Sequence, residues 1–225
     1  MRKPITFFMA VLLISSTTLA NPIKSYTPVL TGVPIDFEGH AEGTLISNQY
    51  PGITFGQDDG GTPMIDNYNW LYGYGASSGS AVLTGSTTGG APYPTVAGIT
   101  MDFNVSHVQL FFSDTSPLGN YTISAYDAGS TLLESFIVLG SEILPPGYTG
   151  GSFPPPGTYP LPGIYVGFAR NVADIARIQI GPSTVWGDAF AIDDVQFSVI
   201  PAPGAILLGG IGVGLVGWLR RRRTL

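Results

Sequence analysis

The chain of 225 residues contains no cysteine. This absence excludes disulfides, thiolate metal sites and thiol catalysis together, so the hydrophobic core must supply the stability of the fold. Charge is also scarce, because only 11% of the residues are Asp, Glu, Lys or Arg, and there are only two histidines, His40 and His107. The histidines are far apart in sequence and show no HExxH arrangement, so nothing indicates a zinc protease.

Basic residues are rarest in the middle of the chain. Six of the nine lie near the two ends, whereas all fifteen acids lie between them. Residues 21–200 therefore carry three basic and fifteen acidic side chains, a net charge of −12. Such a domain is repelled by phosphate backbones, so nucleic acid is excluded as a partner. Clustered carboxylates also raise the prospect of a divalent cation.

No stretch of helical period occurs between Pro22 and Val199. The apolar residues come in about ten short runs separated by glycine, proline or asparagine, and several runs alternate, as in Val108, Leu110 and Phe112. Residues 21–200 are long enough for one domain with a real core. We therefore predict an all-β fold, an antiparallel β-sandwich of jelly-roll type.

Two stretches are predicted as surface loops. Residues 57–79 combine acids, glycines and aromatics, and residues 145–163 are too rich in proline for a central strand. Long loops in compact domains often carry function, but they are also found as passive excursions, and the sequence favours neither.

Residues 1–20 are typical of a secretory signal peptide. Arg2 and Lys3 give a positive start, an apolar stretch follows, and Thr18-Leu19-Ala20 has the small-residue pattern after which signal peptidase cleaves. The alternative, an uncleaved membrane anchor, is disfavoured by the short apolar stretch.

The C-terminal segment 201–225 has three parts. Pro201-Ala202-Pro203 precedes an uncharged stretch over about 204–219, which is near the lower limit of roughly 17 residues for a transmembrane helix. Four arginines then act as a stop on the cytoplasmic side: Arg220, Arg221, Arg222 and Arg223. The alternative is a buried apolar helix followed by a solvated basic end.

This three-part tail resembles the PEP-CTERM sorting signal of exported Gram-negative bacterial proteins, although Ala202 replaces the glutamate of that motif. The resemblance implies that the tail is recognised and processed by an exosortase, a membrane cysteine protease-transpeptidase, at the inner membrane. It also implies a place in the envelope, on the cell surface or in the extracellular matrix, in association with exopolysaccharide or biofilm. Residues 201–203 and 220–223 are then a substrate site, not a catalytic one.

The body resembles the β-sandwich domains that often precede such tails, and more distantly the jelly rolls of the MAM and lectin-like groups. The resemblance is carried by "IDFEGHAEGTLISNQYPGITF" at 35–55 and "GDAFAIDDVQFSV" at 187–199. It implies that the first and last strands lie together and that they hold a structural calcium.

Glu38, Asp193 and Asp194 are the leading candidates for calcium ligands. If the last strand alternates, Asp193 lies on the same face as Ala191, Val195, Phe197 and Val199, where an unpaired carboxylate is costly. Glu42, Asp58 and Asp59 are nearby acids that could complete an oxygen-rich cage. The alternative is that these carboxylates cap turns and accept hydrogen bonds from backbone amides.

An aromatic cluster interleaved with asparagines and glycines is typical of a sugar-stacking loop; its members are Tyr68, Trp70, Tyr72 and Tyr74. Core or rim packing would give the same pattern.

No GxSxG elbow is present, and fifteen acids do not single out a glycosidase pair. We therefore expect a non-enzymatic, exported protein with a structural or adhesive role. A carbohydrate-binding, lectin-like module is the alternative, and a secreted glycan-active hydrolase is the third reading.

Overall fold

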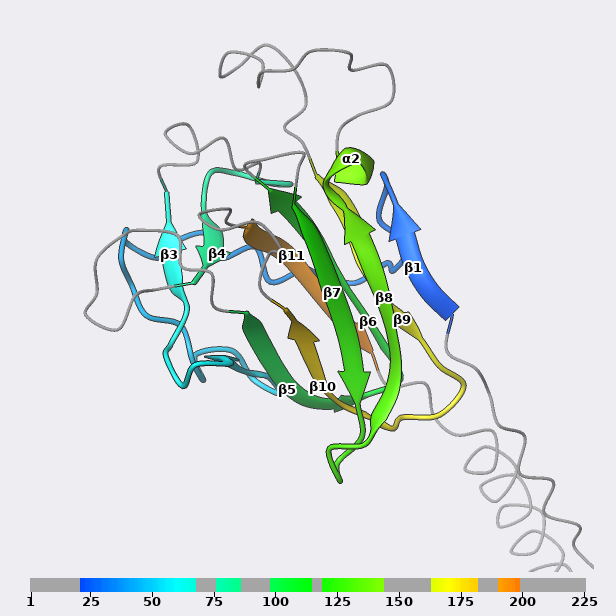
Figure 1. Ribbon diagram of the computed structural model, residues 1–225. Helices are drawn as coiled ribbons and strands as arrows, with labels where there is room; N and C mark the ends of the chain where they lie inside the picture. The colour runs from blue at the N-terminus through cyan, green and yellow to red at the C-terminus, as the bar shows by residue number, and fades with distance from the viewer. Residues whose placement is uncertain are drawn as a thin grey trace, which may run out of the picture.

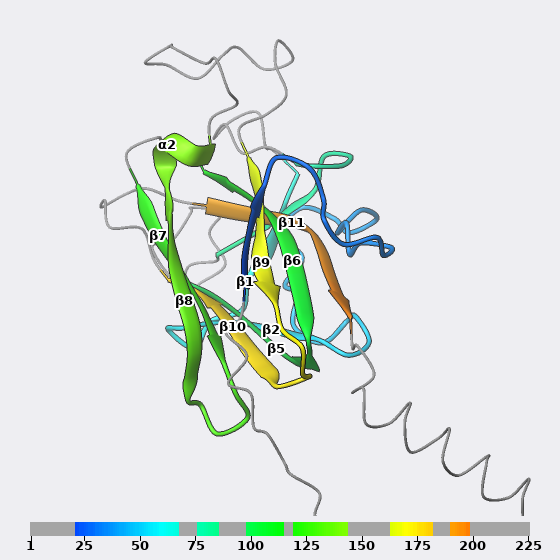
Figure 2. The same cartoon turned by 90° about the vertical axis from the view of Figure 1, so that its right-hand side faces the viewer.

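The computed structural model describes residues 21–67, 76–85, 98–114, 119–143, 163–181 and 190–198. Their strands form two antiparallel sheets (Figures 1 and 2). The six-stranded sheet has the order β1-β9-β6-β11-β4-β3, and the five-stranded sheet has the order β2-β5-β10-β7-β8. The only described helix is the single turn α2, Gly140–Ile143. The prediction of an all-β sandwich is therefore confirmed.

The strand bounds follow the apolar runs of the sequence closely. In chain order the strands are β1 (Asn21–Ser25), β2 (Thr54–Gln57), β3 (Met64–Asp66), β4 (Val82–Thr84), β5 (Ile99–Val105), β6 (His107–Asp114), β7 (Asn120–Tyr126), β8 (Leu132–Leu139), β9 (Ile164–Ala169), β10 (Ile175–Ile180) and β11 (Phe190–Ser198).

Three expectations about strands need correction. Residues 57–79 are not only loop, because they contain β3, whose short apolar stretch pairs with β4. Residues 33–38 do not form a strand and contribute one isolated bridge, from Ile35 to Val195. β1 was not expected, because its sequence, NPIKS, contains no alternation of apolar residues. In the structure only its Ile23 is buried.

Consecutive strands mostly lie in different sheets. Among the described strands, only β3–β4 and β7–β8 are consecutive neighbours within one sheet. Elsewhere the chain crosses from one layer to the other, as it does at Ser106 between β5 and β6. Repeated crossing places the ends of many of the described strands at the same two ends of the sandwich.

The hydrophobic core lies between the two sheets. Val108, Leu110 and Phe112 of β6 face it together, as their alternation predicts. Opposite them, β7 contributes Tyr121, whose ring lies 4.9 Å from that of Phe112 and 5.4 Å from that of Phe190. Every described strand pairs within residues 21–198, so the described ranges have their own sheets and core, and we expect the body 21–200 to fold as one unit.

Candidate functional site

The last strand, β11, contains a bulge at its two aspartates. The register with β6 shifts between Asp193 and Gln196, and Asp194 has a φ of 46°, a left-handed conformation that aspartate tolerates better than most residues. Phe190 and Ile192 face the main core before the bulge, and Val195 and Phe197 face it after the bulge. The extra residue therefore reverses the alternation between the two halves of the strand.

This reversal corrects the predicted position of Asp193. Its side chain does not share a face with Val195 and Phe197, because it lies on the same side as Ala191, which packs with Val82 apart from the main core. Asp193 is nevertheless fully buried, and Asp194 is nearly so. The expectation of a buried carboxylate in β11 is correct, whereas the expected face is wrong.

Asp193 is held by backbone amides. Its Oδ2 accepts hydrogen bonds from the N–H groups of Ser77 (2.8 Å) and Ser78 (3.1 Å), and its Oδ1 accepts one from the N–H of Asp194 (2.7 Å). Two of these donors belong to residues 76–81, a segment that directly precedes β4 and that we name the anchored segment. Asp193 therefore connects β11 to the anchored segment.

Asp194 contacts hydroxyl groups of the same segment. Its Oδ1 accepts a hydrogen bond from Ser78 Oγ (2.9 Å), and its Oδ2 accepts bonds from Ser77 Oγ and from the Tyr165 hydroxyl of β9 (3.3 Å). Ser77 Oγ also lies 2.5 Å from the Tyr165 hydroxyl. Two serines, two aspartates and one tyrosine thus form one polar cluster at the six-stranded sheet.

Glu38 reaches the other end of the anchored segment. Its Oε1 accepts hydrogen bonds from the N–H groups of Ser80 (2.6 Å) and Ala81 (2.7 Å). Gly79 lies between, with a φ of 55°, and a Cβ atom there would meet Glu38 Oε1 at 2.1 Å. The three predicted ligands, Glu38, Asp193 and Asp194, are therefore brought to one six-residue segment.

Burial dominates the ionisation of this cluster. Burial first, and the charge of the neighbouring Asp194 after it, raise the pKa of Asp193 to about 7, although the three amide donors act to lower it. The pKa of the Tyr165 hydroxyl is raised as well, first by burial and then by the charges of the two aspartates.

Other carboxylates of the body act in the same way. Glu42 Oε2 accepts a hydrogen bond from the N–H of Asn67 at the end of β3, and Asp58 Oδ1 accepts one from the N–H of Gly98 before β5 (2.9 Å). Asp127 accepts two bonds within the β7–β8 hairpin, from Gly129 N–H and Thr131 N–H. This is the alternative that the sequence left open for the acids: they accept hydrogen bonds from backbone amides and so fix turns and loops.

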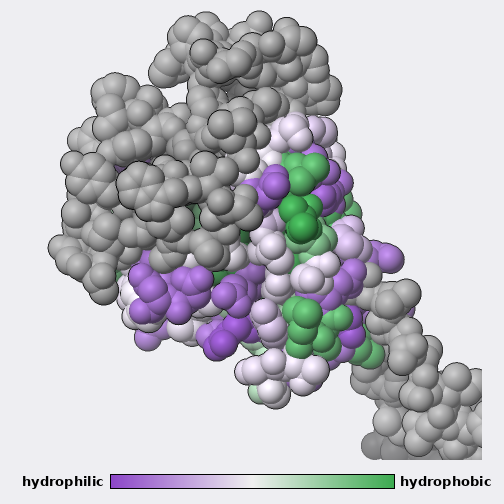
Figure 3. All heavy atoms as spheres, viewed as in Figure 1, coloured by the Kyte–Doolittle hydropathy of each residue, from purple (hydrophilic) through white to green (hydrophobic). Residues whose placement is uncertain are grey.

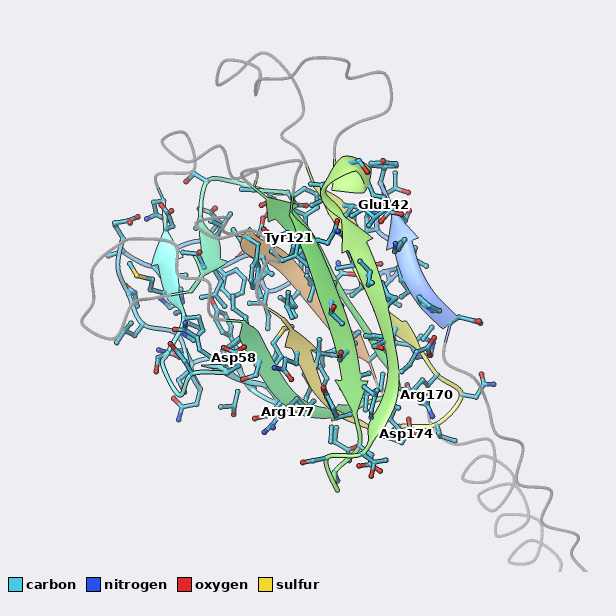
Figure 4. All side chains as sticks on the ribbon, viewed as in Figure 1. Asp58, Tyr121, Glu142, Arg170, Asp174 and Arg177 are labelled. Atoms are coloured by element: carbon cyan, nitrogen blue, oxygen red, sulfur yellow. The ribbon has the colours of Figure 1, made fainter. Side chains whose placement is uncertain are left out.

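The three basic side chains of the body are all paired with acids. Lys24 Nζ lies 2.7 Å from Glu142, Arg170 Nε 2.5 Å from Asp174, and Arg177 Nε 2.6 Å from Asp102. Figure 4 shows Arg170, Asp174 and Arg177 near one end of the sandwich and Glu142 near the other.

A metal site is not established by these contacts. In the described ranges no three His, Asp or Glu side chains are grouped closely enough to hold a metal ion. Glu38 bonds one end of the anchored segment, and the two aspartates bond the other. Calcium binding therefore stays a prediction.

Other predicted residues lie outside the described ranges. These are the aromatic residues Tyr68, Trp70, Tyr72 and Tyr74, the tail residues 201–225, the signal segment 1–20 and almost all of the loop 145–163. Within the described ranges, no helix has the length and apolar character needed to cross a membrane.

Sequence reasoning missed Ser77, Ser78 and Tyr165. The two serines lie next to a glycine in a polar stretch, and nothing in the sequence connects them with acids more than a hundred residues away. Tyr165 lies in a run of apolar residues, where the sequence predicts that a tyrosine packs in the hydrophobic core. Only the pairing of β9 with β6, and of β6 with β11, brings these residues together.

The two histidines lie elsewhere. His107 begins β6 half-buried, with its Nδ1 3.1 Å from Ser106 Oγ, and burial lowers its pKa. The ring of His40 packs against Tyr50 at 5.8 Å. The described contacts of Ser77 are with carboxylates and a tyrosine, so they do not form a Ser-His-Asp triad.

Comparison with known proteins gives only distant structural likeness. No protein-family model matches the chain, and no curated protein matches it. The chain is similar to the K2 cleaved adhesin domain of Lys-gingipain, with 16% identity and a TM-score of 0.44 over 80% of this chain and 98% of that one. It is also similar to the K1 cleaved adhesin domain of Lys-gingipain from Porphyromonas gingivalis W83, with 11% identity and a TM-score of 0.29 over 83% and 100%.

A family 11 carbohydrate-binding module of a Clostridium thermocellum cellulase shows 12% identity and a TM-score of 0.17 over 77% of this chain and 97% of that one. With all three TM-scores below 0.5, these likenesses do not extend to a function.

Proposed function

We propose that this chain is an exported, non-enzymatic β-sandwich protein with a structural or adhesive role at the cell surface or in the extracellular matrix. The observation that carries the proposal is that three carboxylates, two of them buried, accept hydrogen bonds from the anchored segment. Glu38, Asp193 and Asp194 all accept hydrogen bonds from one segment, and Asp193 alone accepts three from backbone amides. Carboxylates occupied in this way form a rigid support for loops rather than an acid–base pair facing a substrate.

Export follows from the sequence of the two ends. Signal peptidase would remove residues 1–20, and an exosortase-type enzyme of the inner membrane would process the tail at Pro201-Ala202-Pro203, with Arg220 to Arg223 as the stop. Cleavage after Ala20 would make Asn21, the first residue of β1, the new N-terminus. The frequent crossing between sheets supports the jelly-roll class within the sandwich architecture.

The first test is the intact mass and the C-terminal peptide of the native protein, taken separately from membrane and extracellular fractions. We expect an extracellular chain that begins at Asn21 and ends near Pro201. A chain that keeps Arg220 to Arg223 and occurs only in membranes would overturn the sorting proposal.

Carbohydrate binding is a second candidate, favoured by the firm attachment of the chain on both sides of residues 68–75. The N–H of Asn67 donates a hydrogen bond to Glu42, and the N–H groups of Ser77 and Ser78 donate to Asp193. A glycan array with the body 21–200 tests this candidate. Loss of a binding signal in Trp70→Ala but not in Trp186→Ala would support a lectin-like site at 68–75, and no signal on host polysaccharides would count against it.

A glycan-active hydrolase is the alternative from another class. Release of reducing ends from the host polysaccharide, lost in a single carboxylate variant, would replace the non-enzymatic proposal.

Calcium is tested separately by thermal unfolding. A native-state ligand raises the melting temperature by mass action, so bound calcium predicts a higher Tm in millimolar calcium than in chelator. An unchanged Tm would exclude calcium as a structural ligand of the body.

A further inference from the structure

The tripeptide Asn-x-Ser/Thr, in which x is not proline, occurs twice in the chain. Asn104-Val105-Ser106 lies at the end of β5, and Asn120-Tyr121-Thr122 begins β7. This tripeptide is the acceptor for N-linked glycosylation of exported proteins. It also occurs by chance, so the surroundings of each asparagine decide whether a glycan can be attached there.

The second tripeptide presents both of its recognition groups to solvent. Asn120 and Thr122 are exposed on the outer face of the five-stranded sheet, and Tyr121 between them is buried in the core. The pairing of β7 with β10 ends at Ile123, so among the described strands Asn120 has a neighbour on β8 alone. The Asn120 amide, which would receive the glycan, and the Thr122 hydroxyl, which completes the acceptor, are therefore accessible together in the folded body.

The first tripeptide presents only its asparagine. Asn104 is exposed, but Ser106 is fully buried where the chain crosses from β5 to β6. The Ser106 hydroxyl donates a hydrogen bond to the carbonyl of Ser198 (3.1 Å). An enzyme that meets the folded body therefore finds a complete acceptor at Asn120 and an incomplete one at Asn104.

Two exposed apolar side chains of β8 lie beside the acceptor. Leu139 is the cross-strand partner of Asn120 and Ile137 that of Thr122, and the two are 42% and 53% exposed. Figure 3 shows apolar side chains among the polar ones over the part of the surface where β8 lies. Directly opposed residues have Cβ atoms about 4.5–5.5 Å apart, so a sugar on Asn120 lies within reach of both side chains. One face of a sugar ring consists of C–H groups, and its contact removes apolar surface from water.

We propose that Asn120 carries an N-linked glycan whose first sugars cover Ile137 and Leu139. The inference rests on the proposed export, because oligosaccharyltransferases act on chains that have crossed the membrane. The donor is an oligosaccharide linked to a polyprenyl pyrophosphate. Nδ2 of Asn120 attacks the anomeric carbon, and the new C–N bond forms as the C–O bond to the pyrophosphate breaks. Nδ2 loses one proton to solvent, and the polyprenyl pyrophosphate leaves.

The test locates the glycan on native protein purified from the extracellular fraction of the host. A protease that cleaves before aspartate separates the two tripeptides, because residues 102–113 and 114–126 then form separate peptides. Mass spectrometry is expected to show a glycan on 114–126 and none on 102–113. Asn104 is thus an internal control: it is exported with the same chain and is exposed, but its partner hydroxyl is buried.

Variants expressed in the same host assign the glycan to one residue. Asn120→Gln is expected to lose it completely. Thr122→Ala leaves the asparagine in place but removes the hydroxyl, so it is expected to lose the glycan too, whereas Thr122→Ser is expected to retain it. Asn104→Gln is expected to change nothing. All these side chains are exposed, so the fold is expected to survive, which circular dichroism checks.

A second measurement tests the contact with β8. Ile137→Thr is expected to shorten retention on a hydrophobic column more in Asn120→Gln, where Ile137 is uncovered, than in the glycosylated chain. An equal shortening in both backgrounds would mean that the glycan points away from β8, and would overturn that half of the proposal.

Three results would overturn the site at Asn120. An extracellular chain that begins at Asn21 but has no glycan on 114–126 would overturn glycosylation and leave export standing. A chain that keeps residues 1–20 and has no glycan would overturn both. A glycan on 102–113 alone would show that the local sequence around Asn104, which includes Asp102, decides the site and that the folded surface does not.

Discussion

The side of the sandwich where β3 and β2 lie is closed by backbone hydrogen bonds, whereas the side where β1 and β8 lie is closed by side chains. On the first side, residues 43–47 run along both sheet edges. Gly43 N–H and Ile46 N–H donate to the carbonyls of Ile65 (2.9 Å) and Pro63 (2.8 Å), and Phe55 N–H donates to the carbonyl of Ser47 (2.7 Å).

On the second side, Lys24 and Glu142 bond each other and the edge of β8, and the Tyr26 hydroxyl donates to the carbonyl of Glu142 (2.8 Å). Backbone bonds persist when a side chain is changed or a group titrates. Bonds through two partly exposed side chains depend on both residues, on pH and on salt. The comparison therefore predicts that the hydrogen bonds on the side of β2 and β3 persist under such changes, whereas those on the side of β1 and β8 can be lost.

The largest effect is expected when the backbone-closed side loses its apolar contact. Ile46 lies in the 43–47 strip and is fully buried in the core. Ile46→Ala leaves a cavity and is expected to lower the free energy of unfolding by about 2–5 kcal/mol, measured by urea unfolding of the body 21–200. Leu45→Ala, at a neighbouring residue that is 51% exposed, is the control and should change little. Equal losses in both variants would mean that the strip is not held by burial.

The Asp193 cluster tests whether side-chain anchoring is weak in itself or only when it is exposed. Asp193→Ala leaves three amide N–H groups without their buried acceptor, which is expected to cost about 1–3 kcal/mol. Asp127→Ala is matched, because Asp127 also accepts two amide hydrogen bonds, but in an exposed hairpin where water replaces it. Urea unfolding should show a clearly larger loss for Asp193→Ala. Similar losses would show that burial adds nothing to this kind of anchor.

The pH dependence of the stability gives a second test of the effect of burial on Asp193. Its folded-state pKa, about 7, lies above its value in the unfolded chain, so the stabilisation from proton binding is present in acid and is lost as pH rises through about 7. The slope from one such group is at most about 1.4 kcal/mol per pH unit. Asp193→Asn does not titrate, so its stability should decrease less than that of the wild type between pH 5 and 8. Parallel curves for the two proteins would contradict the raised pKa.

The sequence predicts the strands of the two sheets better than it predicts the bulge in β11 and the side-chain contacts that connect β11 to the anchored segment. Alternation in Val108, Leu110 and Phe112 indicates a buried face correctly, because the period of a strand is a local property. The same rule fails at Asp193 and Asp194, where an extra residue reverses the faces and no local signal marks the bulge. Glu38, Asp193 and Asp194 were singled out as calcium ligands, which stays a prediction, and the structure shows that all three accept hydrogen bonds from the anchored segment. Their partners Ser77 and Ser78 depend on long-range pairing, which one sequence does not carry.

The smallest effect is expected at the ion pair between Lys24 and Glu142. Lys24 and Glu142 keep side chains that are 30% and 35% exposed, so their pair contributes no more than about 1 kcal/mol. Burial raises the pKa of Glu142, but the hydrogen bonds and charge of Lys24 and the N–H of Leu139 together lower it below its usual value. The contribution is therefore present above the unfolded pKa and lost as pH falls through the folded one.

Comparison of the wild type with Glu142→Gln isolates this contribution, because the titration of Asp193 is common to both proteins. We expect a small difference in the free energy of unfolding at pH 6 that disappears at acid pH and in concentrated salt, whereas the loss from Ile46→Ala stays constant under the same conditions. A difference that survives both acid and salt would mean that the second side of the sandwich is held by packing, as the first is, and the contrast between the two sides would disappear.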